Sequence, residues 1–203
     1  MQDRIVRTLL IAATLGSIGE GMLGPMLSIF TQKIGGSPLD IAASWSVYLI
    51  VTGLFMVVVG YYTDRIEAPE WLLVLGYLLN ALCTFGYIWV ESPAHLLLVQ
   101  AGLGIANALA TPTWDVLFSR NTPNEQSGAL WGAANGQEHI ITGIAIMIGS
   151  SLVYYTSFHV LFVIMGLLQL AATLVQSRLL HKPAQTGEKP IRLLVNLNVA
   201  GNL

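Results

Sequence analysis

The sequence predicts an all-α, polytopic membrane protein, a bundle of six transmembrane helices. Of its 203 residues, 54% are hydrophobic and only 10% are charged, whereas soluble domains carry roughly 25% charged residues. The apolar residues form long runs, each close to the roughly 20 residues that a helix needs to cross a bilayer. Transmembrane strands would instead alternate in polarity over about ten residues. The lipid bilayer is therefore the first partner that the sequence implies.

Six predicted spans follow one another, separated by short loops rich in proline, glycine and asparagine. They run over Ile5–Phe30, Ile41–Tyr62, Trp71–Val90, His95–Phe118, Gly128–Tyr155 and Phe158–Leu180. The first run is longer than a cleaved signal peptide and contains Glu20, so we expect it to remain as a helix. Residues 1–180 thus form one transmembrane domain, and residues 181–203 are predicted to be a cytoplasmic tail or linker.

The distribution of basic residues predicts the orientation in the membrane. The side that would carry both termini has eight of the nine: Arg4, Arg7, Arg65, Arg120, Arg178, Lys182, Lys189 and Arg192. The opposite side has only Lys33. Because cytoplasmic loops carry the excess of Lys and Arg, both termini are expected in the cytoplasm, in a protein of the cell membrane.

Several functional classes are excluded by what the chain lacks. A net charge of −2 is not that of a broadly basic nucleic-acid binder. The single cysteine, Cys83, excludes a disulfide framework and a cysteine-ligated metal site. There is no phosphate-binding loop, no zinc-protease motif and no nucleophile elbow. We therefore expect no enzyme, no ATP-driven pump, no cofactor and no bound metal.

Glu20 is the first candidate for a functional residue, because a carboxylate deep in a span needs a reason to be there. Gly16 and Gly24 lie one turn below and above it, where they would let another helix approach closely. Pro25 is expected to bend the helix just past Glu20. In the functional reading Glu20 lines a water-filled cavity and handles protons or substrate. In the alternative it donates one structural hydrogen bond.

Polar residues also form a stripe along the fourth predicted span, where Asn107, Thr111 and Asp115 share one helical face. Such a stripe faces either the interior of the bundle or an aqueous path. Asp115 lies within about one turn of the cytoplasmic end, and its alternative role is a solvated partner of Arg120. No Lys or Arg lies deep in a span, which argues against a multiply anionic solute.

The fifth predicted span carries Glu138 and His139 near its middle. Adjacent residues of a helix point about 100° apart, so the two cannot both face one narrow cavity squarely. Either is a candidate for a proton or substrate pathway, and a structural contact with a neighbouring helix is the alternative. In the same span Gly128, Gly132 and Gly136 repeat every four residues, which favours close helix packing.

The loop after the second span reads Gly60-Tyr61-Tyr62-Thr63-Asp64-Arg65. It resembles the G-x-x-x-D-R loop of the major facilitator superfamily, and the Gly102-Leu103-Gly104 and Ala110-Thr111-Pro112 segments of the fourth span are similar to that family as well. The resemblance covers about residues 4–180. It implies the N-terminal six-helix half of such a transporter, built from two inverted three-helix repeats.

The resemblance also implies roles for individual residues. Gly60, Asp64 and Arg65 would form a conformational latch at the cytoplasmic surface. The first and fourth spans would line the cavity with the fifth at its flank, and the third and sixth would face outward. Asn80 and Gln169, in those last two spans, are accordingly expected to make hydrogen bonds between helices rather than contacts with a solute.

The resulting hypothesis is a half-size or truncated secondary transporter that moves a small-molecule solute by alternating access, with proton coupling as an option. It would need a second half, either a copy of itself in a homodimer or a separate six-helix chain. The alternative is a non-transporting membrane subunit, or the remnant of a broken gene, that assembles with a partner half.

Overall fold

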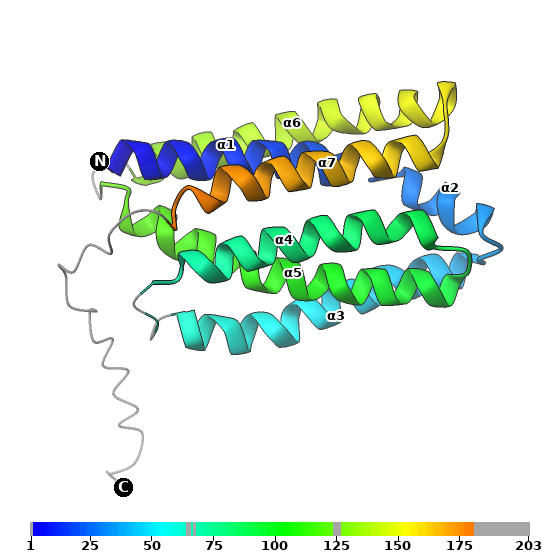
Figure 1. Cartoon of the computed structure of the whole chain (residues 1–203), viewed down its shortest axis with the longest axis horizontal. Coiled ribbons are helices and arrows are strands. Elements are labelled where there is room, and N and C mark those ends of the chain that lie inside the picture. The colour runs from blue at the N-terminus through cyan, green and yellow to red at the C-terminus, as the bar shows by residue number, and fades with distance from the viewer. Residues whose placement is uncertain (1, 64–65, 67, 124–126, 181–203) are drawn as a thin grey trace, which may run out of the picture.

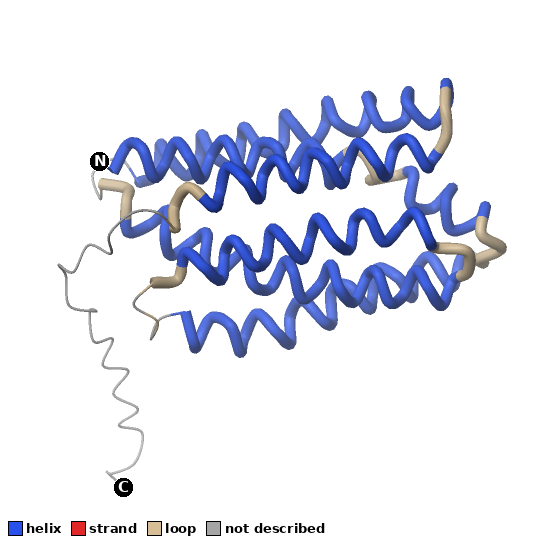
Figure 2. Tube along the Cα trace, in the orientation of Figure 1, coloured by secondary structure: helices blue, strands red, loops and turns tan. Residues whose placement is uncertain are grey.

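The computed structural model describes residues 2–63, 66, 68–123 and 127–180, and it contains helices and no strand within them (Figure 1). The elements are α1 (Gln2–Gly21), α2 (Met26–Lys33), α3 (Pro38–Thr63), α4 (Glu70–Gly86), η1 (Tyr87–Trp89), α5 (Pro93–Arg120), α6 (Ser127–Tyr155) and α7 (Phe158–Ser177). Figure 2 shows how short the loops between the long helices are. Five spans, formed by α3, α4 with η1, α5, α6 and α7, are long and apolar enough to cross a membrane, and the bent pair α1 and α2 brings the number to as many as six. The predicted all-α polytopic fold is confirmed.

The first span is broken rather than continuous. It was expected as one helix over Ile5–Phe30, but α1 ends at Gly21, α2 begins at Met26, and their axes differ by 45°. Pro25, which has no backbone N–H and disfavours helical geometry in the residue before it, stands directly before α2. The bend expected past Glu20 is therefore present, and it is sharp enough to end the helix.

Helix packing places the six spans around a central space. Neighbouring pairs are α3 and α5, α5 and α4, α4 and α7, α7 and α1, and α1 and α6. Figure 1 shows α1, α6 and α7 on one side of the bundle and α3, α4 and α5 on the other. The start of α1 and the end of α7 lie at the same end of the bundle (Figure 1), as an even number of spans requires.

Two buried apolar clusters hold the ends of the bundle together. The first gathers α2, η1 and the start of α7, where the ring of Phe162 stacks on Tyr87 at 5.0 Å and meets Phe30 at 4.9 Å. Burial of such aromatic pairs is a strong source of packing energy. The second cluster lies toward the end with the N-terminus and contains Leu9, Leu73, Leu117, Phe118, Ala134 and Leu179.

Glycine positions show where helices approach most closely. A Cβ added at Gly16 would lie 3.6 Å from the ring of Tyr77, and one at Gly24 would lie 3.2 Å from Ile146, so the structure places both beside a neighbouring side chain. Nothing lies within 4 Å of a Cβ added at Gly128, Gly132 or Gly136. The expected packing role of these three does not occur within the described chain, because this face of α6 points away from α1.

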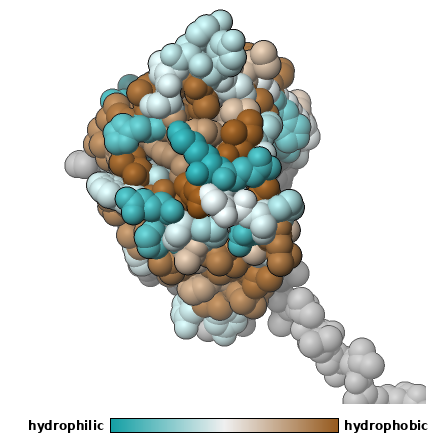
Figure 3. Space-filling model, turned by 90° about the vertical axis from the view of Figure 1, so that its right-hand side faces the viewer, coloured by the Kyte–Doolittle hydropathy of each residue, from teal (hydrophilic) through white to brown (hydrophobic). Residues whose placement is uncertain are grey.

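The surface matches a bilayer environment. Large apolar side chains such as Leu39, Val57 and Leu98 are more than 70% exposed. Figure 3 looks onto the end of the bundle that carries α2 and shows hydrophilic residues across this end, with hydrophobic residues around it. This belt of exposed apolar side chains would be costly in water and is stable in lipid.

Candidate functional site

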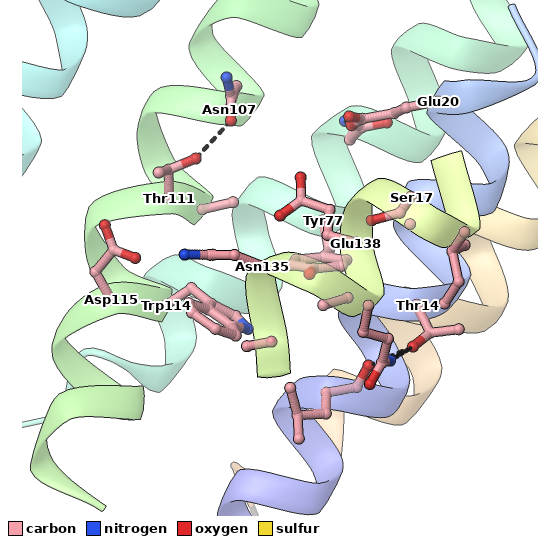
Figure 4. A pocket seen from close by; sticks show the side chains of 18 of the residues that line it. Thr14, Ser17, Glu20, Tyr77, Asn107, Thr111, Trp114, Asp115, Asn135 and Glu138 are labelled. Carbon is pink, nitrogen blue, oxygen red and sulfur yellow. Dashed lines mark hydrogen bonds between the residues drawn. The ribbon is translucent and has the colours of Figure 1, made fainter. Parts of the chain in front are cut away.

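A cavity of about 330 Å³ lies between the helices, lined by residues of α1, α4, α5 and α6 and by Gln169 of α7. Figure 4 shows side chains from these helices converging on the space. Its volume falls within the range of pockets that bind small molecules, roughly 300–1,000 Å³. Polar and charged groups line it at the middle of an otherwise apolar bundle, so this is the candidate solute site.

Glu20 reaches the cavity from the last turn of α1 and is held by α4. The Asn80 amide donates a hydrogen bond of 2.6 Å to its Oε1, and the Thr84 hydroxyl donates one of 3.2 Å to the Asn80 oxygen. Asn80 is only 8% exposed, whereas Glu20 is exposed toward the cavity. The second carboxylate oxygen of Glu20 has no hydrogen bond among the described residues. Asn80 thus fixes one oxygen and leaves the other available to a solute or a proton.

A second hydrogen-bonded chain forms the opposite wall, on α5 and α3. The Thr111 hydroxyl donates to the Asn107 oxygen at 2.6 Å, and the Asn107 amide donates to the Tyr48 hydroxyl at 2.7 Å (Figure 4 shows the first of these). Asn107 and Thr111 line the cavity. The tyrosine in α3 was not identified from the sequence, since an aromatic residue in a span is ordinarily a lipid or core contact.

Glu138 of α6 and Asp115 of α5 add two further carboxylates to the lining. Glu138 is close enough to both Glu20 and Asp115 to interact electrostatically with them. No hydrogen bond to either Glu138 or Asp115 is present among the described residues, and both side chains are exposed to the cavity. The described residues that line the cavity include no Lys, Arg or His. The site therefore has three acidic groups and no basic residue to balance them.

Aromatic side chains form the part of the wall beside these carboxylates. Trp114 and Trp131 meet edge to face at 5.8 Å, with Phe118 packed against both. Both tryptophans line the cavity, as does Tyr77 of α4. The Trp114 indole N–H is buried and has no hydrogen-bond partner within the described part of the chain. We refer to Trp114 and Trp131 as the tryptophan corner.

A second hollow, of about 380 Å³, adjoins the cavity between α1 and the start of α6. The two share Leu10, Thr14 and Gln137. The Gln137 amide donates a hydrogen bond to the Thr14 hydroxyl (Figure 4), so this bond joins α1 and α6 where the two hollows meet. The second hollow extends along Arg7 and Ile11 toward the end that carries the N-terminus.

The structure brings together most of the residues expected to form the pathway, with two exceptions to the sequence-based expectations. Glu20, Asn107, Thr111, Asp115 and Glu138 all line the cavity, whereas His139 is exposed outside it. Its neighbour Glu138 takes the inward direction, and residues adjacent on a helix point about 100° apart.

The second exception concerns Asn80 and Gln169. Both make the expected hydrogen bonds between helices, Gln169 to the Gly16 carbonyl at 3.1 Å. Both also line the cavity, although their spans were expected to face outward. Gly60 lies near the end of α3 with open space around it, and the other two latch residues, Asp64 and Arg65, fall outside the described residues.

Comparison with known proteins gives a consistent result. The family model of the Major Facilitator Superfamily matches residues 9–195. The chain is 22% identical over 197 residues to the multidrug resistance protein MdtG of Klebsiella pneumoniae, an alignment that covers 95% of this chain and 48% of that protein. It is 24% identical over 132 residues to MdtG of Salmonella arizonae, covering 63% of this chain and 32% of the relative.

An archaeal relative extends the similarity beyond enterobacteria. The uncharacterized MFS-type transporter MJ1560 of Methanocaldococcus jannaschii is 23% identical over 158 residues, covering 78% of this chain and 41% of that protein. The chain thus spans about half the length, or less, of the curated relatives it matches.

Proposed function

Because the chain belongs to the Major Facilitator Superfamily, we propose that it acts as one six-helix half of a secondary transporter that carries a small solute by alternating access. The observation that carries this proposal is the cavity at mid-depth, where Glu20 stands with one oxygen held by Asn80. Two of the relatives named above are multidrug resistance proteins by name, which supports solute transport as the type of activity.

Proton coupling through Glu20 is part of the proposal. A carboxylate deep in a span defaults to a functional role, and Glu20 has a cavity beside it through which a proton could arrive and leave. Asn80 can donate to the Glu20 oxygen whether or not the other oxygen carries a proton. Glu20 could therefore load and release a proton without losing its position.

A second half is needed to complete the site. In the most apolar 18-residue stretch of α3 and of α6 only 11% is buried, against 44% in α7. Asn135 and Glu138 of α6 line the cavity and are exposed within a span. Each polar group that lacked a partner there and met lipid would cost several kcal/mol. We propose that a second copy of this chain or a separate six-helix half covers them, and native mass spectrometry in mild detergent would show twice 21.9 kDa for a homodimer.

The latch and the orientation complete the proposal. Both termini would lie in the cytoplasm, on the side where the basic residues are concentrated. The loop with Gly60, Asp64 and Arg65 would then contact the other half at the cytoplasmic surface and influence the balance between inward- and outward-facing states.

Alternating access can be tested without knowing the solute. In a Cys83→Ser background, a cysteine replacing Thr111 lies on the cavity wall. In sealed proteoliposomes of uniform orientation, a transporter should let a membrane-impermeant maleimide reach this cysteine from either side, at different rates. A cysteine replacing Leu98, which is 73% exposed on the outer surface of α5, is the control and should not show this two-sided reactivity.

The alternative, a non-transporting subunit, predicts a different labelling result. Reaction of the cysteine at position 111 from one side only would contradict alternating access and favour that alternative. The rate of maleimide labelling rises with pH for any cysteine, because the thiolate is the reacting form. If Glu20 is the coupling residue, Glu20→Gln is expected to remove the pH dependence of the ratio between the labelling rates from the two sides. An unchanged pH dependence of this ratio would argue that Glu20 is structural.

A further inference from the structure

The geometry points to an organic cation as the class of solute that this cavity selects. The positive group would lie between Glu20 and Glu138, and its apolar or aromatic body would pack against the tryptophan corner. This inference rests on the proposed function, since it names the solute of the same cavity. It adds Trp131 and Glu138 as the residues that determine specificity.

The charge of the lining is the first step of the argument. Glu20, Asp115 and Glu138 come from three different helices and face one space, with Glu138 interacting electrostatically with the other two. None of the three has an ion-pair partner among the residues that line the cavity. Like charges brought together in a region of low dielectric repel strongly. A positively charged solute removes this repulsion, whereas an anion would add to it.

The aromatic wall is a second, independent observation. Trp114 and Trp131 stand nearly perpendicular, at 76°, so that the pair offers a corner rather than a flat surface. Tryptophan presents a large aromatic surface that packs well against the ring or alkyl groups of an organic solute. The remaining wall includes apolar side chains, among them Leu10 and Ile141. A solute with both a charge and an apolar body would satisfy both parts of the lining.

The same wall argues for an organic rather than an inorganic ion. Within the described residues no group of His, Cys, Asp and Glu side chains is arranged closely enough to hold a metal. A bare metal ion would gain nothing from Trp131, Leu10 or Ile141. The volume of about 330 Å³ also suits a molecule with a ring or several alkyl groups better than a single ion.

A set of shape-matched compounds tests this inference directly. Radiolabelled benzyltrimethylammonium is the probe, and its binding to the full 203-residue chain in nanodiscs is measured by equilibrium dialysis against empty nanodiscs. Its neutral carbon isostere, neopentylbenzene, and the anion benzylsulfonate serve as competitors. We expect saturable binding of the probe, displacement by unlabelled probe, and at least tenfold weaker competition by the neutral and anionic compounds.

Variants then assign the binding to this cavity. Glu138→Gln should weaken probe binding by roughly tenfold or more through the lost Coulomb attraction between the carboxylate and the quaternary ammonium, and Glu138→Asp should retain most of it. Trp131→Leu should weaken it by roughly 3–10-fold through the lost aromatic packing against the ring of the probe. Glu91→Gln and Trp89→Leu make the same substitutions at exposed positions outside the cavity and should leave binding unchanged.

The possible failures can be told apart. Equal competition by the three compounds would overturn the inference, and so would probe binding that Glu138→Gln and Trp131→Leu leave intact. The comparison of compounds uses the unmodified chain, so it stands even if a variant does not fold. Two-sided labelling of the cysteine at position 111 without cation binding would refute only the solute class. Cation binding without two-sided labelling would refute transport and retain the cation site.

Discussion

Gly149 of α6 is the glycine at which an added methyl group should lower the free energy of unfolding most. It packs against Met22, which lies in the break of the first span, two residues after Glu20. A Cβ added at Gly149 would lie 2.6 Å from Cα of Met22 and 2.7 Å from its carbonyl carbon. Cβ atoms essentially never approach other heavy atoms closer than 3.0 Å. The obstacle is backbone and cannot rotate away, so Gly149→Ala would push α6 away from the end of α1.

The size of the effect follows from two opposing contributions. Overpacking that shifts backbone costs about 1–3 kcal/mol, and contact with main-chain atoms places Gly149→Ala at the upper end, about 3 kcal/mol. Alanine in place of glycine within a helix returns about 1 kcal/mol. The net loss of unfolding free energy is therefore about 2 kcal/mol. Gly132→Ala, in the same helix but with open space beside it, should show only the favourable contribution.

Reversible unfolding in mixed detergent and dodecyl sulfate micelles, followed by circular dichroism, measures both variants. We expect Gly149→Ala to be less stable than Gly132→Ala by about 3 kcal/mol, a difference from which the helix-propensity contribution cancels. Equal stability of the two variants would refute the close approach of α6 to the break at Met22, and with it the placement of Glu20 at the cavity.

Three further outcomes are expected. Asn80→Leu removes the hydrogen bond to Glu20 at nearly constant volume, so the pH dependence of the ratio between the two labelling rates at position 111 should shift or disappear. Thr84→Val, one hydrogen bond further from Glu20, should shift it less. Identical effects of the two variants would argue against a positioning role for Asn80. A cysteine replacing Ser37 should react with impermeant maleimide from outside intact cells and one replacing Asn124 should not, because eight of the nine basic residues lie on the side of Asn124. The opposite pattern would invert the topology. Asp64→Asn should change the rate of solute exchange while the affinity for benzyltrimethylammonium stays within a few-fold, since the proposed latch contacts the other half and not the solute. Complete loss of binding in folded protein would contradict this role.

The helices themselves were predictable, because a run of apolar residues near 20 in length has few alternatives. The break at Pro25 was predictable as a bend, since proline disrupts helical hydrogen bonding wherever it stands. The inward direction of Glu20, Asn107 and Glu138 followed from the high cost of turning such groups toward lipid. Helix formation and the bend at Pro25 depend on local sequence. The direction of the polar side chains depends on the cost of exposing them to lipid.

The differences between expectation and structure share one cause. His139 does not line the cavity beside Glu138, and no side chain meets the glycines at 128, 132 and 136 within the described residues. Asn80 makes the expected hydrogen bond between helices and lines the cavity as well. Helical periodicity predicts which residues share a face, but it does not predict whether that face meets another helix, the lipid or the cavity. Most of the surface of a span is apolar whether it meets lipid or another helix, so hydrophobicity orients the helix less strongly than it does in water.

The sequence by itself therefore determined that this chain is a polytopic membrane protein with carboxylates within the first, fourth and fifth spans. Only the tertiary structure decided which partners those carboxylates meet. Glu20 and Asn80 are sixty residues apart and joined by a 2.6 Å hydrogen bond, and Trp114 and Trp131 meet across two helices. Such contacts depend on the rotation and depth of one helix against another. The rotation and depth of each helix are set by packing along its whole surface, including the close approach at Gly149, and not by any local pattern of residues.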